Sequence, residues 1–278
     1  LLLMRDQEQG AGEAGMIEKQ KAILHHLASD PLLLWMLVFL AGFLVLGMLT
    51  GFFRVRRIQP GALRWKQIRI EIVVIAIGFA TSGLFIGAWT NFLKSTGWIQ
   101  FNLAPAAWWQ IVLEFLLYFV LFDTWFYWLH RAVHIEPLYK LIHKWHHYST
   151  APTVFTTVSV NPLETLFSGG FLPLMTAVIT LHRDSMVFIG PFAALMGLYV
   201  HSGYEFLPRW WNKSWATKWF ITATFHDQHH KYFNYNYGGY TTLWDRLCGT
   251  VRKKYEHDFE NPKARRLNAL AAKDHAAV

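Results

Sequence analysis

The chain has 278 residues, of which 53% are hydrophobic, 17% aromatic and only 16% charged. Because soluble domains carry roughly a quarter charged residues, this composition argues against an ordinary soluble protein and favours one that lies in a lipid bilayer. The net charge of +8 does not indicate a nucleic-acid partner, since the basic residues lie beside apolar segments and not in a basic domain of their own.

Three apolar segments are long enough to cross a membrane as helices, which takes about 20 mostly apolar residues. They cover residues 32–53, 70–89 and 108–129. Two shorter apolar segments, 166–181 and 186–200, are separated only by a short polar turn and are predicted to form a tight helical hairpin that crosses the membrane or enters it partway. We therefore predict an all-α, polytopic membrane protein with about four membrane helices, including the short hairpin.

Basic residues predict the orientation of these segments, because short loops rich in Lys and Arg stay cytoplasmic. Six such residues lie between the first two segments, namely Arg54, Arg56, Arg57, Arg64, Lys66 and Arg69, whereas the loop 92–107 contains only Lys94. The first loop is therefore predicted to be cytoplasmic. Counting onward along the spans, every cluster of histidines then lies on the cytoplasmic side.

Histidines follow the apolar segments in three clusters with helical spacing. Residues three or four positions apart share one face of a helix, so each cluster can present several imidazoles to a metal. The members are His130 and His134, then His143, His146 and His147, then His226, His229 and His230, and a further candidate, His201, directly follows the hairpin. The single cysteine, Cys248, excludes both an intramolecular disulfide and a metal site built from several cysteines.

Nine imidazoles exceed the four ligands of a structural zinc site, and the clusters therefore predict two metal ions. Imidazole binds iron, zinc, copper and nickel alike, so the ligand type alone leaves the ion open. A site at the membrane surface with no obvious hydrolytic carboxylate or nucleophile favours oxygen activation over Lewis-acid hydrolysis. Isolated histidines, such as His182 and His257, are predicted to have ordinary structural roles.

Carboxylates near the clusters are candidates to support the metal-bound histidines, which usually donate their other ring N–H to a carboxylate or carbonyl. The candidates are Asp123 in the third apolar segment, Glu164, Asp227 within the last cluster, and Asp245. Each of them could equally cap a helix or form a salt bridge.

The motifs HRAVH, HKWHH and HDQHH resemble the three histidine boxes of the fatty acid hydroxylase and sterol desaturase superfamily. The surrounding sequence, over about residues 108–250, is closest in appearance to sterol desaturases and sterol methyl oxidases. This resemblance implies a helical membrane domain below a cytosolic helical cap that holds two iron ions on the nine histidines, His201 included. Zinc can replace iron in a recombinant preparation.

One departure from the family pattern lies at Asn161, where the relatives often have a histidine. The sequence leaves open whether Asn161 binds a metal weakly, holds a water or leaves a coordination position open, and this affects the expected substrate.

The resemblance implies an oxidoreductase that uses O2 as cosubstrate to hydroxylate or desaturate a lipid, preferably a sterol or related polycyclic lipid. A fatty-acyl, ether-lipid or carotenoid substrate would use the same motifs. Electrons are expected from a separate protein, a cytochrome b5-like protein, a ferredoxin or a reductase, since no fused cytochrome-like or flavin-binding segment is evident. The competing classes are a divalent-metal transporter, whose ligands should lie near the bilayer midplane, and a noncatalytic lipid-binding protein with structural metal.

The chain is thus predicted to have four parts. These are an N-terminal extension (1–30), the first two transmembrane helices (31–107), the catalytic domain with the histidine boxes, third span and hairpin (108–250), and a polar C-terminal tail (251–278). The short length and the absence of a recognisable retention signal favour a bacterial inner membrane over the endoplasmic reticulum.

Overall fold

The computed structural model describes residues 32–59, 61–98 and 102–262. The predicted N-terminal extension and the last part of the predicted tail lie outside these ranges. The described chain is helical, as predicted. Its β-type backbone pairing is limited to three isolated bridges among these residues, for example between Arg57 and Tyr204.

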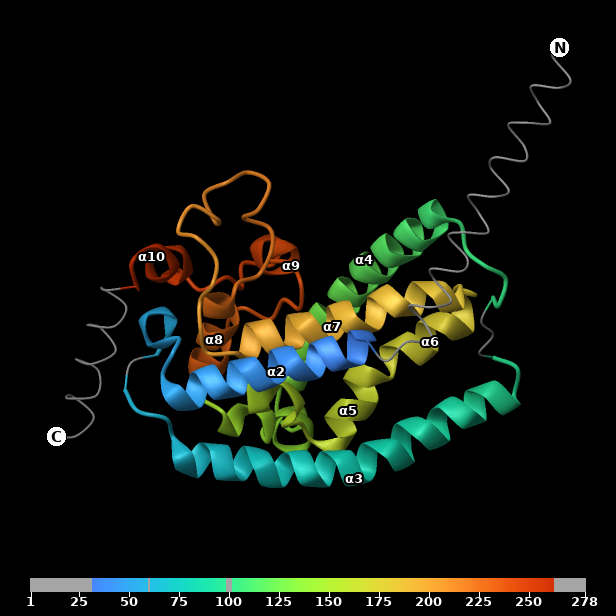
Figure 1. Ribbon diagram of the computed structural model, residues 1–278, viewed down its shortest axis with the longest axis horizontal. Helices are drawn as coiled ribbons and strands as arrows, with labels where there is room; N and C mark the ends of the chain where they lie inside the picture. The colour runs from blue at the N-terminus through green and yellow to red at the C-terminus, as the bar shows by residue number, and fades with distance from the viewer. Residues whose placement is uncertain (1–31, 60, 99–101, 263–278) are drawn as a thin grey trace, which may run out of the picture.

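Nine α-helices make up most of the described chain (Figure 1). They are α2 (Leu32–Thr50), α3 (Trp65–Ser95), α4 (Trp108–Val133), α5 (Pro162–Gly169), α6 (Phe171–Val178), α7 (Met186–His201), α8 (Ala223–Tyr232), α9 (Leu243–Leu247) and α10 (Tyr255–Glu260). The long helices α2, α3 and α7 run along the length of the molecule, and the short helices α8, α9 and α10 gather at the end where α2 and α7 finish and α3 begins.

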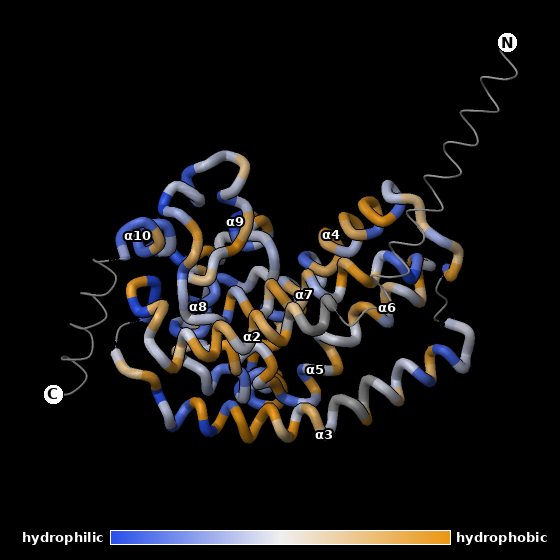
Figure 2. The backbone as a smooth tube through the Cα atoms, viewed as in Figure 1, coloured by the Kyte–Doolittle hydropathy of each residue, from blue (hydrophilic) through white to orange (hydrophobic). Residues whose placement is uncertain are grey.

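Two helices of the described residues are long and apolar enough to cross a membrane, Trp108–Val133 and Arg183–His201. Helices also cover the first two predicted spans, as α2 and α3. Many of their apolar side chains face outward, including Phe39 and Phe79, which are 73% and 71% exposed; Figure 2 shows the apolar colouring along α2, α4 and α7. Outward-facing apolar residues on long helices suit a lipid environment, while the number of spans stays a prediction.

The apolar hairpin differs from its prediction in the first arm. Residues 166–181 do not form one helix, because α5 ends and α6 begins around Gly170. A Cβ atom at Gly170 would overlap the carbonyl oxygen of Leu166, four residues earlier in the chain. The close approach of this carbonyl to residue 170 therefore requires glycine. Each of α5 and α6 is about 12 Å long, too short to cross a bilayer alone. The second arm is the continuous helix α7, reached through the turn Arg183–Ser185.

A buried carboxylate joins α3 to the segment that follows the second histidine cluster. Glu71 is only 1% exposed, although it lies in an apolar stretch of sequence. It accepts hydrogen bonds of 2.7–2.9 Å from the side chains of Gln67, Ser149, Thr153 and Thr156. Glu71 therefore fixes the path of the chain directly after His147.

The predicted polar tail is folded over its first part, up to residue 262. In α10, Tyr255 and Phe259 are buried against Phe225 of α8, and Arg252 forms an ion pair of 2.7 Å with Asp258. This small apolar core packs α10 against the helix that carries the third histidine cluster.

Candidate metal centre

Five chain segments bring the histidines to one end of the molecule. His130 lies in the last turn of α4 and His134 caps its C-terminus. His143 ends a π-helical turn, Tyr139–His143, and His146 and His147 begin a 3-10 turn, His146–Tyr148. The remaining histidines lie at the end of α7 and along α8, and they are His201, His226, His229 and His230.

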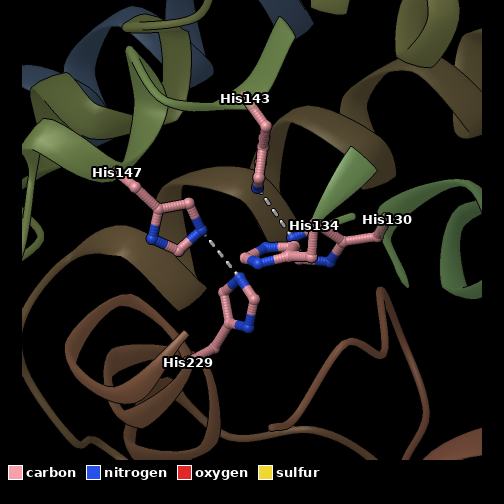
Figure 3. A group of neighbouring side chains, drawn as sticks. All are labelled: His130, His134, His143, His147 and His229. Atoms are coloured by element: carbon pink, nitrogen blue, oxygen red, sulfur yellow. Dashed lines mark hydrogen bonds between the residues drawn. The ribbon is translucent and has the colours of Figure 1, made fainter. Parts of the chain in front are cut away.

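The nine histidines form two groups, and within each group one nitrogen from every ring lies within 4.8 Å of all the others. The first histidine group contains His130, His134, His143, His147 and His229, whose rings face one another in Figure 3. The second histidine group contains His146, His201, His226 and His230. All nine histidines that the sequence singled out are thus brought together, five in one group and four in the other.

Spacing along the chain explains most of this division. Pairs four residues apart share a group, as His226 and His230 do, whereas His229 between them faces the other group. His143, His146 and His147 do not share one face as expected, because His143 and His147 belong to the first group and His146 belongs to the second, which repeats the division seen in α8. Helix α8 therefore lies between the two groups and contributes to both.

The tautomers in the first histidine group leave lone pairs facing one another. The Nδ1 atom of His130 lies 2.8 Å from the carbonyl oxygen of Tyr237, and Nδ1 of His143 lies 2.8 Å from the Glu164 carboxylate. The carbonyl oxygen can only accept, as can Glu164 in its carboxylate form, so both Nδ1 atoms then carry the proton and both Nε2 atoms present lone pairs. These Nε2 atoms are nevertheless 3.0 Å apart. A cation between them fits this arrangement, whereas a hydrogen bond between two neutral rings does not.

The second histidine group has the same arrangement. His201 donates from Nδ1 to the carbonyl of Gly197 at 2.8 Å, and His146 donates from Nδ1 to the carbonyl of Ser159 at 3.3 Å. Their Nε2 atoms are 3.2 Å apart with no proton to share. Further buried ring nitrogens have no hydrogen-bond partner within the described chain; they are Nε2 of His134 and Nδ1 of His147, His226 and His230. Both groups therefore have the donor set of a metal site.

Burial keeps these imidazoles in the form that binds metals. Loss of solvent around His146 lowers its pKa to about 4, and burial followed by repulsion from neighbouring rings lowers the pKa of His147 and His229 well below the usual value. Metal ions bind the neutral imidazole, so no proton has to be displaced at neutral pH.

Two of the predicted carboxylates lie where they can orient histidines. Glu164 accepts directly from His143, which is the contact expected for a supporting carboxylate. Asp245 acts through the backbone, since it accepts from the amide nitrogens of Tyr237 and Gly238 at 2.9 and 2.7 Å. It therefore fixes the turn whose Tyr237 carbonyl accepts the hydrogen bond from His130.

The other candidates bind elsewhere. Asp123 accepts from the backbone amides of Tyr240 and Thr241, both at 2.8 Å, and so holds this loop against α4. Asp227 accepts from the Gln59 side chain at 3.0 Å.

Asn161 caps the N-terminus of α5. Its side-chain oxygen accepts from the amide of Leu163 at 2.9 Å, and its side-chain nitrogen donates to the carbonyl of Leu141 at 3.2 Å. Asparagine is a favoured residue at this helix position. The side chain thus fastens α5, which carries Glu164, to the turn that carries His143.

Replacement of Asp245 by asparagine tests the supporting role of the turn. One acceptor oxygen becomes a donor facing an amide or hydroxyl donor, which costs about 2 kcal/mol of stability, and the Tyr237 carbonyl loses its fixed position. We expect a lower melting temperature in detergent and partial loss of metal. Unchanged melting and metal content would contradict this role.

An apolar cavity of about 380 Å³ reaches the histidines along α4 and α7. Helix α4 lines it with Tyr118, Phe122, Phe126 and His130, which are spaced one turn apart, and α7 lines it from Ile189 to His201. Both histidine groups border the cavity, through His130 and His143 of the first and His146, His201 and His226 of the second. An apolar molecule in this cavity would have one end at the metal centre.

Sequence reasoning did not identify Glu71, the Tyr237 carbonyl or the cavity walls. The sequence signal for Glu71 is an acid at the edge of an apolar segment, where a charge is costly unless it is bound. A backbone carbonyl has no such signal, because any residue can provide one.

Comparison with known proteins now defines the class. The fatty acid hydroxylase family model matches residues 115–250. A C-4 methylsterol oxidase of Schizosaccharomyces pombe is 31% identical over 233 residues, which are 78% of this chain and 72% of the relative. The chain therefore belongs to the fatty acid hydroxylase family.

Two further relatives show the same likeness over shorter stretches. A Delta(7)-sterol 5(6)-desaturase of Aspergillus fumigatus is 35% identical over 53% of this chain and 40% of its own length. Methylsterol monooxygenase 1 of Danio rerio is 40% identical over 50% of this chain and 47% of its own length. The matched region thus spans less than half the length of these two relatives. No solved structure matches the chain.

Proposed function

We propose that the protein is a membrane-bound oxidoreductase that uses O2 to hydroxylate or desaturate a lipid, and that a sterol or related polycyclic lipid is its preferred substrate. The observation that carries the proposal is the convergence of two groups of imidazole lone pairs on one end of an apolar cavity. The names of the relatives, which are sterol desaturases and methylsterol oxidases, support the substrate class.

The first histidine group would hold one iron ion and the second histidine group the other. When bound, the two irons supply the chemistry that takes a hydrogen atom from an unactivated carbon with electrons and O2 from outside. Three oxygen atoms would orient the imidazoles by accepting hydrogen bonds from their Nδ1 atoms. They are the carbonyls of Tyr237 and Gly197 and the carboxylate of Glu164, and they leave the Nε2 atoms of His130, His201 and His143 facing the metal positions. The five imidazoles of the first histidine group exceed what tetrahedral zinc takes.

The cavity positions the substrate and keeps water away. Its walls are mostly aromatic and aliphatic, and they hold an apolar chain or ring system along α4 and α7. Holding the reacting carbon close to the oxidising centre replaces a bimolecular encounter with a fixed geometry. Excluding water also protects reactive species from side reactions.

We further propose that the metal centre lies on the cytoplasmic side, with a bacterial inner membrane as the preferred location. A separate electron-transfer protein, cytochrome b5-like, a ferredoxin or a reductase, would deliver the electrons. The basic residues around Arg56 and Arg64 lie in the connection between α2 and α3, at the same end of the molecule as α8 (Figure 1). A basic surface steers an acidic partner to such a site.

The test is turnover by the purified full chain loaded with iron and supplied with O2, a chemical or protein reductant and a sterol mixture. We expect mass spectrometry to find a sterol that has gained one oxygen or lost two hydrogens. The zinc-loaded protein serves as the inactive control. A product only from fatty-acyl lipids would replace the sterol assignment, and no product from any lipid, with iron bound, would contradict the enzyme assignment.

A further inference from the structure

The cavity extends well away from the histidines. Along α4 it runs from Tyr118 to His130 and along α7 from Ile189 to His201, and both helices run toward the metal centre. Each of these stretches covers about 18 Å along a helix axis. The cavity therefore has a near end, at the histidines, and a far end about three helical turns away.

The far end holds a pair of hydroxyl groups. The Tyr118 and Tyr240 hydroxyls are 2.9 Å apart, and both residues line the cavity. Each is only 3% exposed. The rings of Phe119, Phe122 and Phe192 surround Tyr240, with centroids 4.9–5.2 Å from its ring. The pair is thus a polar point among aromatic rings.

This hydroxyl pair has one donor more than it uses. Two tyrosines carry two O–H groups, and the bond between them uses one. Within residues 32–59, 61–98 and 102–262 no other hydrogen bond of either hydroxyl occurs. A buried donor without an acceptor is costly, so the second O–H calls for an oxygen in the cavity.

Ordered water does not fit this requirement well. A buried water makes about three hydrogen bonds to polar partners, whereas the side chains packed around the Tyr240 ring are three phenylalanines, which offer none. An oxygen atom carried by an otherwise apolar ligand meets the requirement without further polar partners.

We propose that the Tyr118–Tyr240 hydroxyl pair binds the oxygen atom at the polar end of the lipid, a hydroxyl or carbonyl oxygen, so that the carbon facing the histidines lies remote from that oxygen. The oxidation of that carbon rests on the proposed function, whereas the binding of the oxygen does not. The pair then acts as a specificity-determining site that sets which part of the lipid reaches the metal centre.

Binding to the zinc-loaded full chain tests the site without turnover. The probes are radiolabelled cholesterol and the matching hydrocarbon that lacks the hydroxyl group. We expect the wild type to bind cholesterol about tenfold more tightly than the hydrocarbon. Either single substitution leaves one hydroxyl, so the test uses the double variant Tyr118→Phe with Tyr240→Phe. This variant should bind cholesterol and the hydrocarbon equally, and its affinity for the hydrocarbon should equal that of the wild type.

Tyr127→Phe is the matched control, because Tyr127 is a buried tyrosine of α4 whose hydroxyl contacts Thr250 and does not line the cavity. It should keep the tenfold preference. Equal binding of the two probes by the wild type, or a preserved preference in the folded double variant, would overturn the proposal.

Product analysis tests the orientation separately. With the iron-loaded enzyme and a hydroxylated sterol, we expect oxidation at a carbon far from the hydroxyl group. Oxidation next to that hydroxyl would overturn the orientation even if binding behaves as expected. A failure of turnover with an intact binding preference would instead count against the proposed function alone.

Discussion

Alanine at His229 or at His226 is expected to remove one metal ion and abolish turnover. His229 belongs to the first histidine group and His226 to the second, so each change should reduce the metal content from two ions to about one per chain. Both His229 and His226 are buried, so each change takes one imidazole out of its group and leaves the ion there with one protein ligand fewer. We expect a loss of turnover of at least about a thousandfold, measured beside metal content by plasma mass spectrometry.

His257→Ala is the matched control for both variants. The His257 side chain is 59% exposed, and its Nδ1 atom lies 3.4 Å from the carboxylate of its neighbour Asp258. This variant should retain both ions and full turnover. If His226→Ala and His229→Ala kept two ions, or if His257→Ala lost one, the assignment of the two groups would be wrong.

Glu71→Ala is expected to destabilise the protein by about 4 kcal/mol. The change leaves four buried donors of α3 and of residues 149–156 without their acceptor, and hydrogen bonds to a charged group contribute roughly 1.5–3 kcal/mol each, with incomplete additivity. The chain after His147 then loses three of its hydrogen bonds to α3, those from Ser149, Thr153 and Thr156. Unfolding in detergent, followed by tryptophan fluorescence, should show the loss, with metal released at lower denaturant.

An exposed acid provides the comparison for Glu71. Glu136 forms an ion pair with Lys140 in which the side chains are 53% and 71% exposed, and such pairs contribute little to stability. Glu136→Ala should therefore change the free energy of unfolding by less than about 0.5 kcal/mol. Equal effects of the two substitutions would show that Glu71 does not hold the site.

Helix periodicity made most of the candidate site predictable from sequence. Pairs four residues apart, such as His130 with His134, share one helix face in any α-helix, and the apolar segments indicated where the helices run. The position of His201 after an apolar segment made it a candidate, and the family resemblance included it among the ligands. The sequence thus indicated which nine histidines meet, although its spacing rules did not divide them into two groups.

Three features of the structure could not be predicted from the sequence. His146 belongs to the second histidine group, although His143 and His147 on either side belong to the first, and helical spacing of three residues did not predict this division. The break at Gly170 depends on a close backbone approach that apolar periodicity does not report. Asp123 contacts a loop more than a hundred residues away along the chain, and Asp245 contacts a loop fewer than ten residues away. The sequence did not indicate either contact.

Asn161 shows how a structural contact changes the interpretation of a motif. Its departure from the family pattern left open a weak ligand, a water site or an open coordination position. Its side chain instead caps α5 and binds the carbonyl of Leu141. This residue supports the frame around Glu164 and His143, and both of its polar side-chain atoms have protein partners.

Anomalous diffraction at the iron absorption edge, from crystals of the iron-loaded full chain, tests the central claim most directly. The account predicts two iron peaks, one enclosed by the first histidine group and one by the second, about 4–6 Å apart as in a wide two-metal site. A single peak, or peaks away from the nine imidazoles, would contradict it.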